Sequence, residues 1–209
     1  MRAVKLPLRY QITEYDCGPT SLLNAVSFLF EREEIPPEIV RNIMLYCLDT
    51  YGSDGFFGKS GTSHTAMMFL SHWLDGFGKT GRLSIRSDYL AGRDVNFSSD
   101  SRIVSALRRG GAAVVRLDLD GWHYVLMTGI GEEGVHLFDP YYMPEPLPFE
   151  DVAAVRGQDE CCNRIVPVER LETQEIRPYA LGPSETREAV LLFNSATELT
   201  EENTVEYMI

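Results

Sequence analysis

A dense run of apolar positions follows Asp16, in the segment DCGPTSLLNAVSFLF. Pro19 fits the first turn of a helix, where its missing N–H costs nothing. The apolar residues after it occupy nearly the whole helical circumference: Leu22, Leu23, Ala25, Val26, Phe28, Leu29 and Phe30. A helix that is apolar on all sides is a buried one. The pattern therefore predicts a buried helix from Asp16 to Phe30.

Three further helices are predicted in the first half of the chain. An apolar stripe predicts one from Pro37 to about Leu48, and another runs from about Thr62 to Leu74, after a loop punctuated by glycines. Asp100 or Ser101 can cap a short fourth helix that ends in the basic pair Arg108–Arg109.

The hydrophobic period changes from Ala112 onward. Short β-branched or aromatic runs follow, bounded by glycine, proline and acids: AAVVRLDL, WHYVLMTG, GVHLFD, NRIVPV and REAVLLFN. Two of these runs flank GIGEEG and predict a hairpin. Helices first and strands afterwards indicate an α+β fold with an antiparallel sheet.

Composition narrows the class of protein. A length of 209 residues fits one domain, or two small ones. The net charge of −12 and the lack of a basic stripe argue against nucleic-acid binding. No run reaches the ~18 apolar residues of a membrane span, and residues 1–11 lack the apolar stretch of a signal peptide. We expect a cytoplasmic domain over residues 1–195 and an acidic tail over 196–209.

Cys17 is the candidate nucleophile, because it stands at the amino end of the predicted buried helix. Unpaired N–H groups and the helix dipole stabilise a thiolate there, and a cationic neighbour completes the activation. His123 opens the strand WHYVLMTG, where its side chain can face a cleft. The alternative for Cys17 is a small buried core residue, the commonest fate of a free cysteine.

The remaining histidines and cysteines suggest no metal site. His64 and His72 are eight positions apart, roughly 12 Å by helical rise, which is too far to share a metal. We expect both on the polar face of their helix, and His136 falls inside a predicted strand. Cys161 and Cys162 are adjacent and have no second ligand pair with zinc spacing, which favours a structural role. We expect neither a metal nor a cofactor.

Asp139 is the candidate partner of His123. In a hairpin centred on Gly131 the two residues are directly opposed, with Cβ atoms ~4.5–5.5 Å apart. A carboxylate at that distance can accept the imidazole proton, and the three residues then form a Cys–His–Asp triad. The alternative for Asp139 is a turn residue that only ends the strand before Pro140.

This arrangement depends on the length of the hairpin loop. An even-length loop would put His123 and Asp139 on opposite faces of the sheet. We therefore predict an odd loop from Gly129 to Glu133, with Thr128 facing Gly134.

Acyl transfer also requires donors for an oxyanion. The backbone N–H of Cys17 is one candidate, because it belongs to an exposed helix start. The amide of Gln11, six residues upstream, is another, since it donates a hydrogen bond without titrating.

The motifs Q-x4-DCGPT, WHYV and FDPYY together resemble the papain-like superfamily. The nearest branch contains the bacteriocin-processing peptidases that remove double-glycine leader peptides, with their stand-alone relatives. The resemblance implies a papain-like fold and a cysteine peptidase acting through a thioester on a peptide or small amide, with small residues before the cut in a leader peptide. It assigns the nucleophile to Cys17, the oxyanion donor to Gln11, and the other triad positions to His123 and Asp139.

The resemblance spans about the first two thirds of the chain, and the stretch after about Cys161 matches nothing in it. An acyltransferase on the same scaffold, or a peptide-binding relative without catalysis, stays open as an alternative. The residues do not identify the substrate or the oligomeric state.

Overall fold

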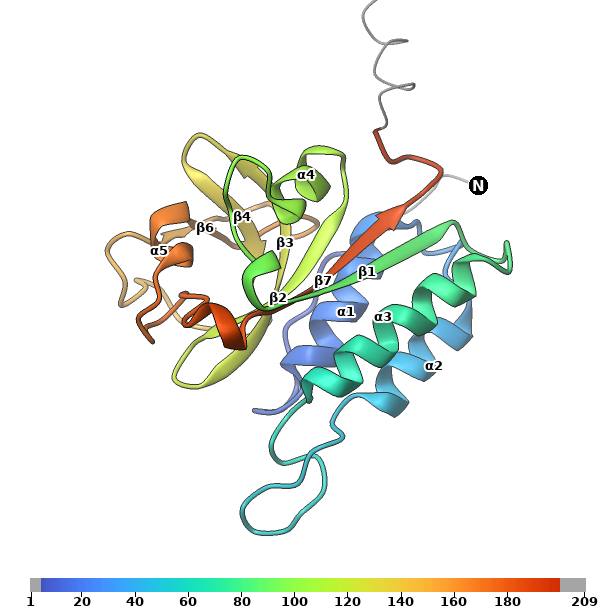
Figure 1. Ribbon diagram of the computed structural model, residues 1–209, viewed down its shortest axis with the longest axis horizontal. Coiled ribbons are helices and arrows are strands. Elements are labelled where there is room, and N and C mark those ends of the chain that lie inside the picture. The colour runs from blue at the N-terminus through green and yellow to red at the C-terminus, as the bar shows by residue number, and fades with distance from the viewer. Residues whose placement is uncertain (1–4, 200–209) are drawn as a thin grey trace, which may run out of the picture.

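A seven-stranded antiparallel sheet runs through the molecule, and helices cover both of its faces (Figure 1). This computed structural model describes residues 5–199. The strand order is β1-β7-β2-β3-β4-β6-β5. The strands are β1 (Ile85–Ala91), β2 (Ala112–Asp118), β3 (Trp122–Gly131), β4 (Gly134–Phe138), β5 (Ala153–Ala154), β6 (Arg164–Val166) and β7 (Glu188–Asn194).

Three helices lie against one face of the sheet, and two shorter helices lie against the other (Figure 1). The first group is α1 (Cys17–Leu29), α2 (Pro37–Tyr46) and α3 (His64–Gly78). The second group is α4 (Arg102–Arg108) and α5 (Val168–Glu172), and two 3-10 turns are η1 (Gly92–Asp94) and η2 (Ser184–Thr186). No helix within the described residues is both long and apolar enough to span a membrane.

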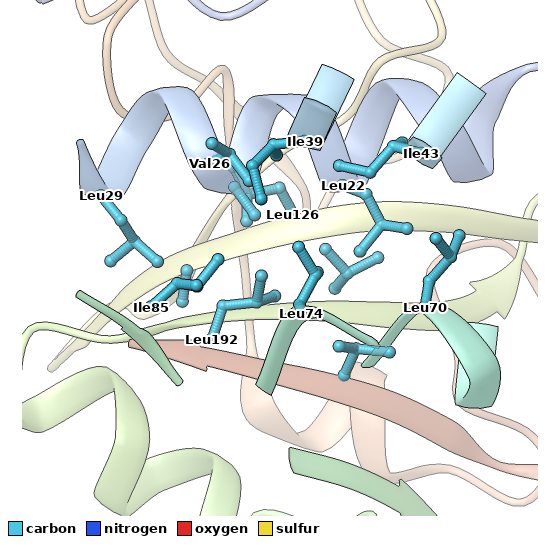
Figure 2. Packing of buried hydrophobic residues seen from close by; sticks show 14 of the residues in the cluster. Leu22, Val26, Leu29, Ile39, Ile43, Leu70, Leu74, Ile85, Leu126 and Leu192 are labelled. Atoms are coloured by element: carbon cyan, nitrogen blue, oxygen red, sulfur yellow. The ribbon is translucent and has the colours of Figure 1, made fainter. Parts of the chain in front are cut away.

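Each face of the sheet has its own hydrophobic core. Figure 2 shows the first core, in which Leu22 of α1 and Leu70 of α3 pack with Leu126 of β3. Alternate residues of the central strands point to opposite faces, so Val114 joins the first core and Val115 the second. A mixed helical and antiparallel β fold, as predicted, is the result.

The four predicted helices are present, with small changes at their ends. α2 stops two residues early, because the backbone of Cys47 is already extended, with ψ 172°. α3 begins two residues late, where the Ser63 hydroxyl accepts a hydrogen bond from the Ala66 N–H. It continues four residues beyond the predicted end and thereby buries Phe77 in the first core.

The sequence pattern missed three elements. β1 is an edge strand that pairs only with β7, and its solvent-facing positions include Arg86 and Asp88. Charged residues are common on edge strands and weaken the apolar signal that identifies a strand. β5 and α5 have only two and five residues, too few for a period to appear.

The predicted hairpin loop is wrong. Gly131 pairs with Gly134, so the turn holds only Glu132 and Glu133 instead of the predicted Gly129–Glu133. An even loop alone would place His123 and Asp139 on opposite faces.

A β-bulge at Thr128 restores the expected face. The pairing shifts by one residue between Met127 and Gly129, so Leu126 lies opposite Phe138. Continuing this register puts Asp139 opposite Val125, two residues from His123. The two side chains therefore share a face as diagonal neighbours rather than as a directly opposed pair.

The described part of the predicted acidic tail, residues 196–199, is attached to the domain. Glu198 is only 8% exposed and pairs with Arg86 at 2.9 Å and Arg109 at 3.0 Å. The Leu199 N–H donates to the Arg109 carbonyl oxygen at 3.0 Å. The rest of the predicted tail, residues 200–209, lies outside the described residues.

Two glycines provide a test of the packing between β4 and β6. A Cβ at Gly134, where φ is 136°, would lie 2.4 Å from the Val166 carbonyl oxygen, whereas Gly110, with φ 77°, has open space around it. We expect Gly110→Ala to cost only the left-handed backbone penalty of ~1–2 kcal/mol. Gly134→Ala should lower the free energy of unfolding by clearly more, because it forces two strands apart. Urea denaturation of both variants measures the difference, and equal losses would contradict the expectation.

Candidate active site

Cys17 and His123 meet where their elements begin. Cys17 is the first residue of α1 and His123 the second of β3. One turn into the helix, the Ser21 hydroxyl donates to the Tyr124 carbonyl oxygen at 3.0 Å. Both groups of this bond are buried, so it fixes the position of α1 along β3. The docking of α1 on β3 thus brings the predicted nucleophile to the predicted base.

His123 and Asp139 form the hydrogen bond that the sequence analysis predicted. The Nε2 atom of His123 lies 2.8 Å from Oδ1 of Asp139, whose side chain has no solvent exposure. The same Oδ1 accepts the Tyr141 N–H at 2.8 Å, and Oδ2 accepts the Tyr179 hydroxyl at 2.6 Å. Both oxygens of the buried carboxylate are therefore hydrogen-bonded.

Asn163 holds the backbone of Asp139. Its side-chain oxygen accepts the Asp139 N–H at 2.8 Å, and its side-chain nitrogen donates to the Asp139 carbonyl oxygen at 2.8 Å. Just before this point, the Asn163 N–H donates to the Leu137 carbonyl oxygen at 3.0 Å. The side-chain amide of Asn163 thus continues the hydrogen bonding between β4 and β6 as far as the backbone of Asp139.

The surroundings of His123 favour its charged form. Burial alone would lower its pKa, but the hydrogen bond that His123 donates to Asp139, then its hydrogen bond with Cys17, and the charges of both residues raise the pKa to about 10. Because Nε2 is taken by Asp139, the other ring nitrogen is left for Cys17. The positive charge of the imidazolium therefore lies beside the Cys17 thiol, at the start of α1.

The loop before α1 places Gln11 in the same cleft as Cys17 and His123. Its backbone N–H donates to the Pro140 carbonyl oxygen at 2.9 Å, one residue after Asp139. Its side-chain nitrogen donates to the Thr13 carbonyl oxygen at 2.7 Å. An amide nitrogen carries two N–H groups, so this bond leaves one for a ligand. The Gln11 Oε1 atom is buried with no hydrogen-bond partner among the described residues.

Asp16 organises this loop. Its carboxylate accepts the N–H of Ile12 at 3.0 Å and both the N–H and the hydroxyl of Thr13 at 2.6 Å. Burial would raise the pKa of Asp16, but these hydrogen bonds, led by the Thr13 hydroxyl, hold it below its ordinary value. The residue before the nucleophile therefore shapes the segment that carries Gln11.

A cleft of about 380 Å³ contains Cys17, His123 and Gln11. Its remaining lining residues are Glu14, Leu119, Asp120, Gly121, Trp122, Tyr141, Met143, Phe149 and Pro178. Apolar side chains form much of the cleft wall. Apart from His123, the charged lining residues are Glu14 and Asp120, and both are acidic. The structure thus gathers all four predicted site residues: three line the cleft, and Asp139 lies buried behind His123.

The other candidate residues lie elsewhere. His64 and His72 are exposed on α3, as predicted, and His136 is half-buried in β4. All four cysteines are free thiols; Cys162 is buried, and its thiol donates to Gln158 Oε1 at 3.3 Å. Within the described residues, no group of three or more His, Cys, Asp or Glu side chains could hold a metal ion.

The sequence analysis missed Tyr179, Asn163 and Asp16. Tyr179 and Asn163 lie in the later part of the chain that the motifs do not cover, and each acts through contacts distant in sequence. Asp16 carried a signal, because aspartate directly before a helix is typical of an N-cap. In the structure its side chain turns to the preceding loop instead.

Comparison of the chain with protein-family models and with curated protein sequences finds no match.

The raised pKa of His123 should make stability depend on pH. The folded value of about 10 exceeds the ordinary value of 6.5, so the contribution of the imidazolium is complete below pH 6.5. It is lost as the pH rises through 10. Asp139→Asn removes the charge that supports the imidazolium, so the stability difference between parent and variant should be largest near pH 6 and shrink toward pH 10. Urea unfolding across this range tests the expectation, which a constant or growing difference would contradict.

Proposed function

We propose that this protein is a cysteine hydrolase that cleaves an amide bond of a peptide through a thioester intermediate. One observation carries the proposal: His123 is held between a fully buried Asp139 and Cys17, beside a cleft that Gln11 also lines. Nucleophile, base and orienting group, each in reach of the next, are the signature of this chemistry. The α+β architecture is compatible with a papain-like fold, and the motif resemblance to leader peptidases supports the same assignment.

In the first step, His123 holds the proton of Cys17 as an imidazolium, and the thiolate attacks the scissile carbonyl carbon. The carbonyl oxygen becomes an oxyanion, which the Gln11 amide and the Cys17 backbone N–H can stabilise. Asp139 fixes the ring of His123 through Nε2 and stabilises the imidazolium.

In the second step, the imidazolium of His123 gives its proton to the leaving amine, and the acyl group remains on Cys17 as a thioester. Water then attacks the thioester carbonyl while His123 accepts a proton from it. The collapse of this second oxyanion returns the thiol and releases a carboxylic acid.

The cleft favours a peptide that is neutral or cationic and has apolar side chains. Glu14 and Asp120 are exposed at the cleft, and apart from His123 no lining residue is basic. Acidic walls raise the local concentration of cationic ligands. Leu119, Met143 and Phe149 offer an apolar surface. A precursor or leader peptide is the substrate class that the motif resemblance favours.

Replacing Cys17 tests the proposed chemistry directly. Cys17→Ala and Cys17→Ser should abolish turnover of any amide substrate and leave the fold intact, because the change in volume is small and the role is chemical. Peptide cleavage with and without added amines measures the activity, and an acyl–amine product would identify an acyltransferase instead. Cys162→Ala, which changes a buried cysteine outside the cleft, is the matched control. Activity that survives in Cys17→Ala would overturn the assignment.

Replacing Gln11 distinguishes acyl transfer from simple reactivity of the Cys17 thiol. Gln11→Ala should lower the acylation rate by ~10²–10³, since an oxyanion donor acts on charge that develops in the transition state. Alkylation of Cys17 by iodoacetamide forms no oxyanion and should be nearly unchanged. If both rates fall together, Gln11 supports the loop before α1 rather than the oxyanion. If neither falls, it has no part in the reaction.

A further inference from the structure

We propose that Tyr179 is a positioning residue of this site, whose phenol holds Asp139 in the orientation that His123 requires. The inference rests on the proposed function and adds to it a residue that neither the motifs nor the family resemblance covers. It stands on three observations: the bond to Asp139, the backbone of Tyr179, and the contact between Tyr179 and the cleft wall.

The bond completes the hydrogen bonding of a buried charge. Tyr179 is fully buried, and its hydroxyl donates to Oδ2 of Asp139 at 2.6 Å. The other oxygen, Oδ1, serves His123 and the Tyr141 N–H. Without the phenol, Oδ2 would be a buried charged atom with no partner among these groups, and such an atom is costly. The carboxylate would then rotate or take up a proton, and either change weakens its support of His123.

The phenol is a donor at every working pH. Burial and the nearby charge of Asp139 raise the pKa of Tyr179 above its ordinary value. The facing guanidinium of Arg164 opposes this shift only in part. The neutral hydroxyl therefore presents its proton to the carboxylate, so that Oδ2 of Asp139 is hydrogen-bonded while Oδ1 serves His123.

The backbone of Tyr179 is held in an unfavourable conformation. Its φ of 63° lies in the left-handed region, which is rare for a bulky residue and unfavourable. Two hydrogen bonds maintain it: the Tyr179 N–H donates to the Asp118 carbonyl oxygen at 2.7 Å, and the Asp118 N–H donates to the Ala180 carbonyl oxygen at 2.8 Å. Strain that the surrounding structure maintains in this way is typical of functional sites.

Tyr179 also connects Asp139 to the cleft wall. Phe149 lines the cleft and packs edge-on against the Tyr179 ring, with centroids 5.5 Å apart. Behind this contact, Tyr179 and Asp139 are both fully buried. A dry environment strengthens a hydrogen bond to a charged group.

The chain offers a matched control for the loss of this bond. Tyr89 donates to Oε2 of Glu188 at 2.9 Å, and Glu188 is also a buried carboxylate. Neither residue lines the cleft or bonds to Asp139 or His123. Tyr89→Phe therefore removes the same chemical group from an equivalent bond outside the site.

The experiment compares Tyr179→Phe with Tyr89→Phe. We expect Tyr179→Phe to lower kcat about 10-fold to 100-fold, the range for groups that orient a functional residue, with KM nearly unchanged. The pH–rate profile should narrow from its alkaline side, because the imidazolium of His123 is less well supported in the variant and loses its proton at a lower pH. The pH dependence of Cys17 alkylation by iodoacetamide should narrow in the same way, and Tyr89→Phe should leave both profiles unchanged.

A purely structural role predicts lower stability with unchanged profiles in Tyr179→Phe, and that result would overturn the proposal. If Tyr179→Phe does not fold, Phe149→Leu takes its place in the experiment. This variant removes the ring that packs against Tyr179, so the alkylation profile should narrow in the same direction but less. An unchanged alkylation profile would reject the positioning role of Tyr179. Activity surviving in Cys17→Ala would instead defeat the proposed function. The two failures are therefore distinguishable.

Discussion

A carboxylate without solvent contact costs several kcal/mol to bury, and the structure around Asp139 offsets that cost. Its donors are His123 in β3, the N–H of Tyr141 just after β4, and the phenol of Tyr179. Asn163 holds its backbone from a further segment. Because all of these groups hydrogen-bond to Asp139, the segments that carry them are held in fixed positions relative to one another. The orientation of His123 toward Cys17 follows from that joint positioning.

Most of the architecture could be predicted from local pattern. The buried helix after Asp16 and the strands from Ala112 and Glu188 are apolar on all sides or in continuous runs, because helices cover both faces of the sheet. β1 could not be identified in this way, since an edge strand that carries Arg86 and Asp88 has no such signature. Each of the four predicted site residues lies at or near an end of a helix or strand. The sequence pattern indicates these ends, so it also indicated where the four side chains could meet.

The remaining features depend on contacts that leave no periodic trace. The predicted five-residue loop put His123 and Asp139 on one face of the sheet, but the loop itself is wrong. The observed two-residue turn alone would put them on opposite faces, and the bulge at Thr128 shifts the pairing by one residue and reverses that effect. Gly129, directly after Thr128, is a residue type that often marks a bulge, but the predicted loop began at this glycine. Tyr179 and Asn163 act through bonds that span 40 and 24 positions, so only the three-dimensional structure connects them with Asp139.

The position of β7 has a consequence for the order in which this fold can be completed. β7 lies between β1 and β2, yet a ribosome makes it after every other strand of the sheet. Cys17, His123 and Asp139 have all been synthesised by then, while β1 and β2 still present open edges to solvent. The phenol of Tyr179 also emerges late. A nascent chain that has not reached β7 therefore contains these residues without the strand that joins β1 to the rest of the sheet.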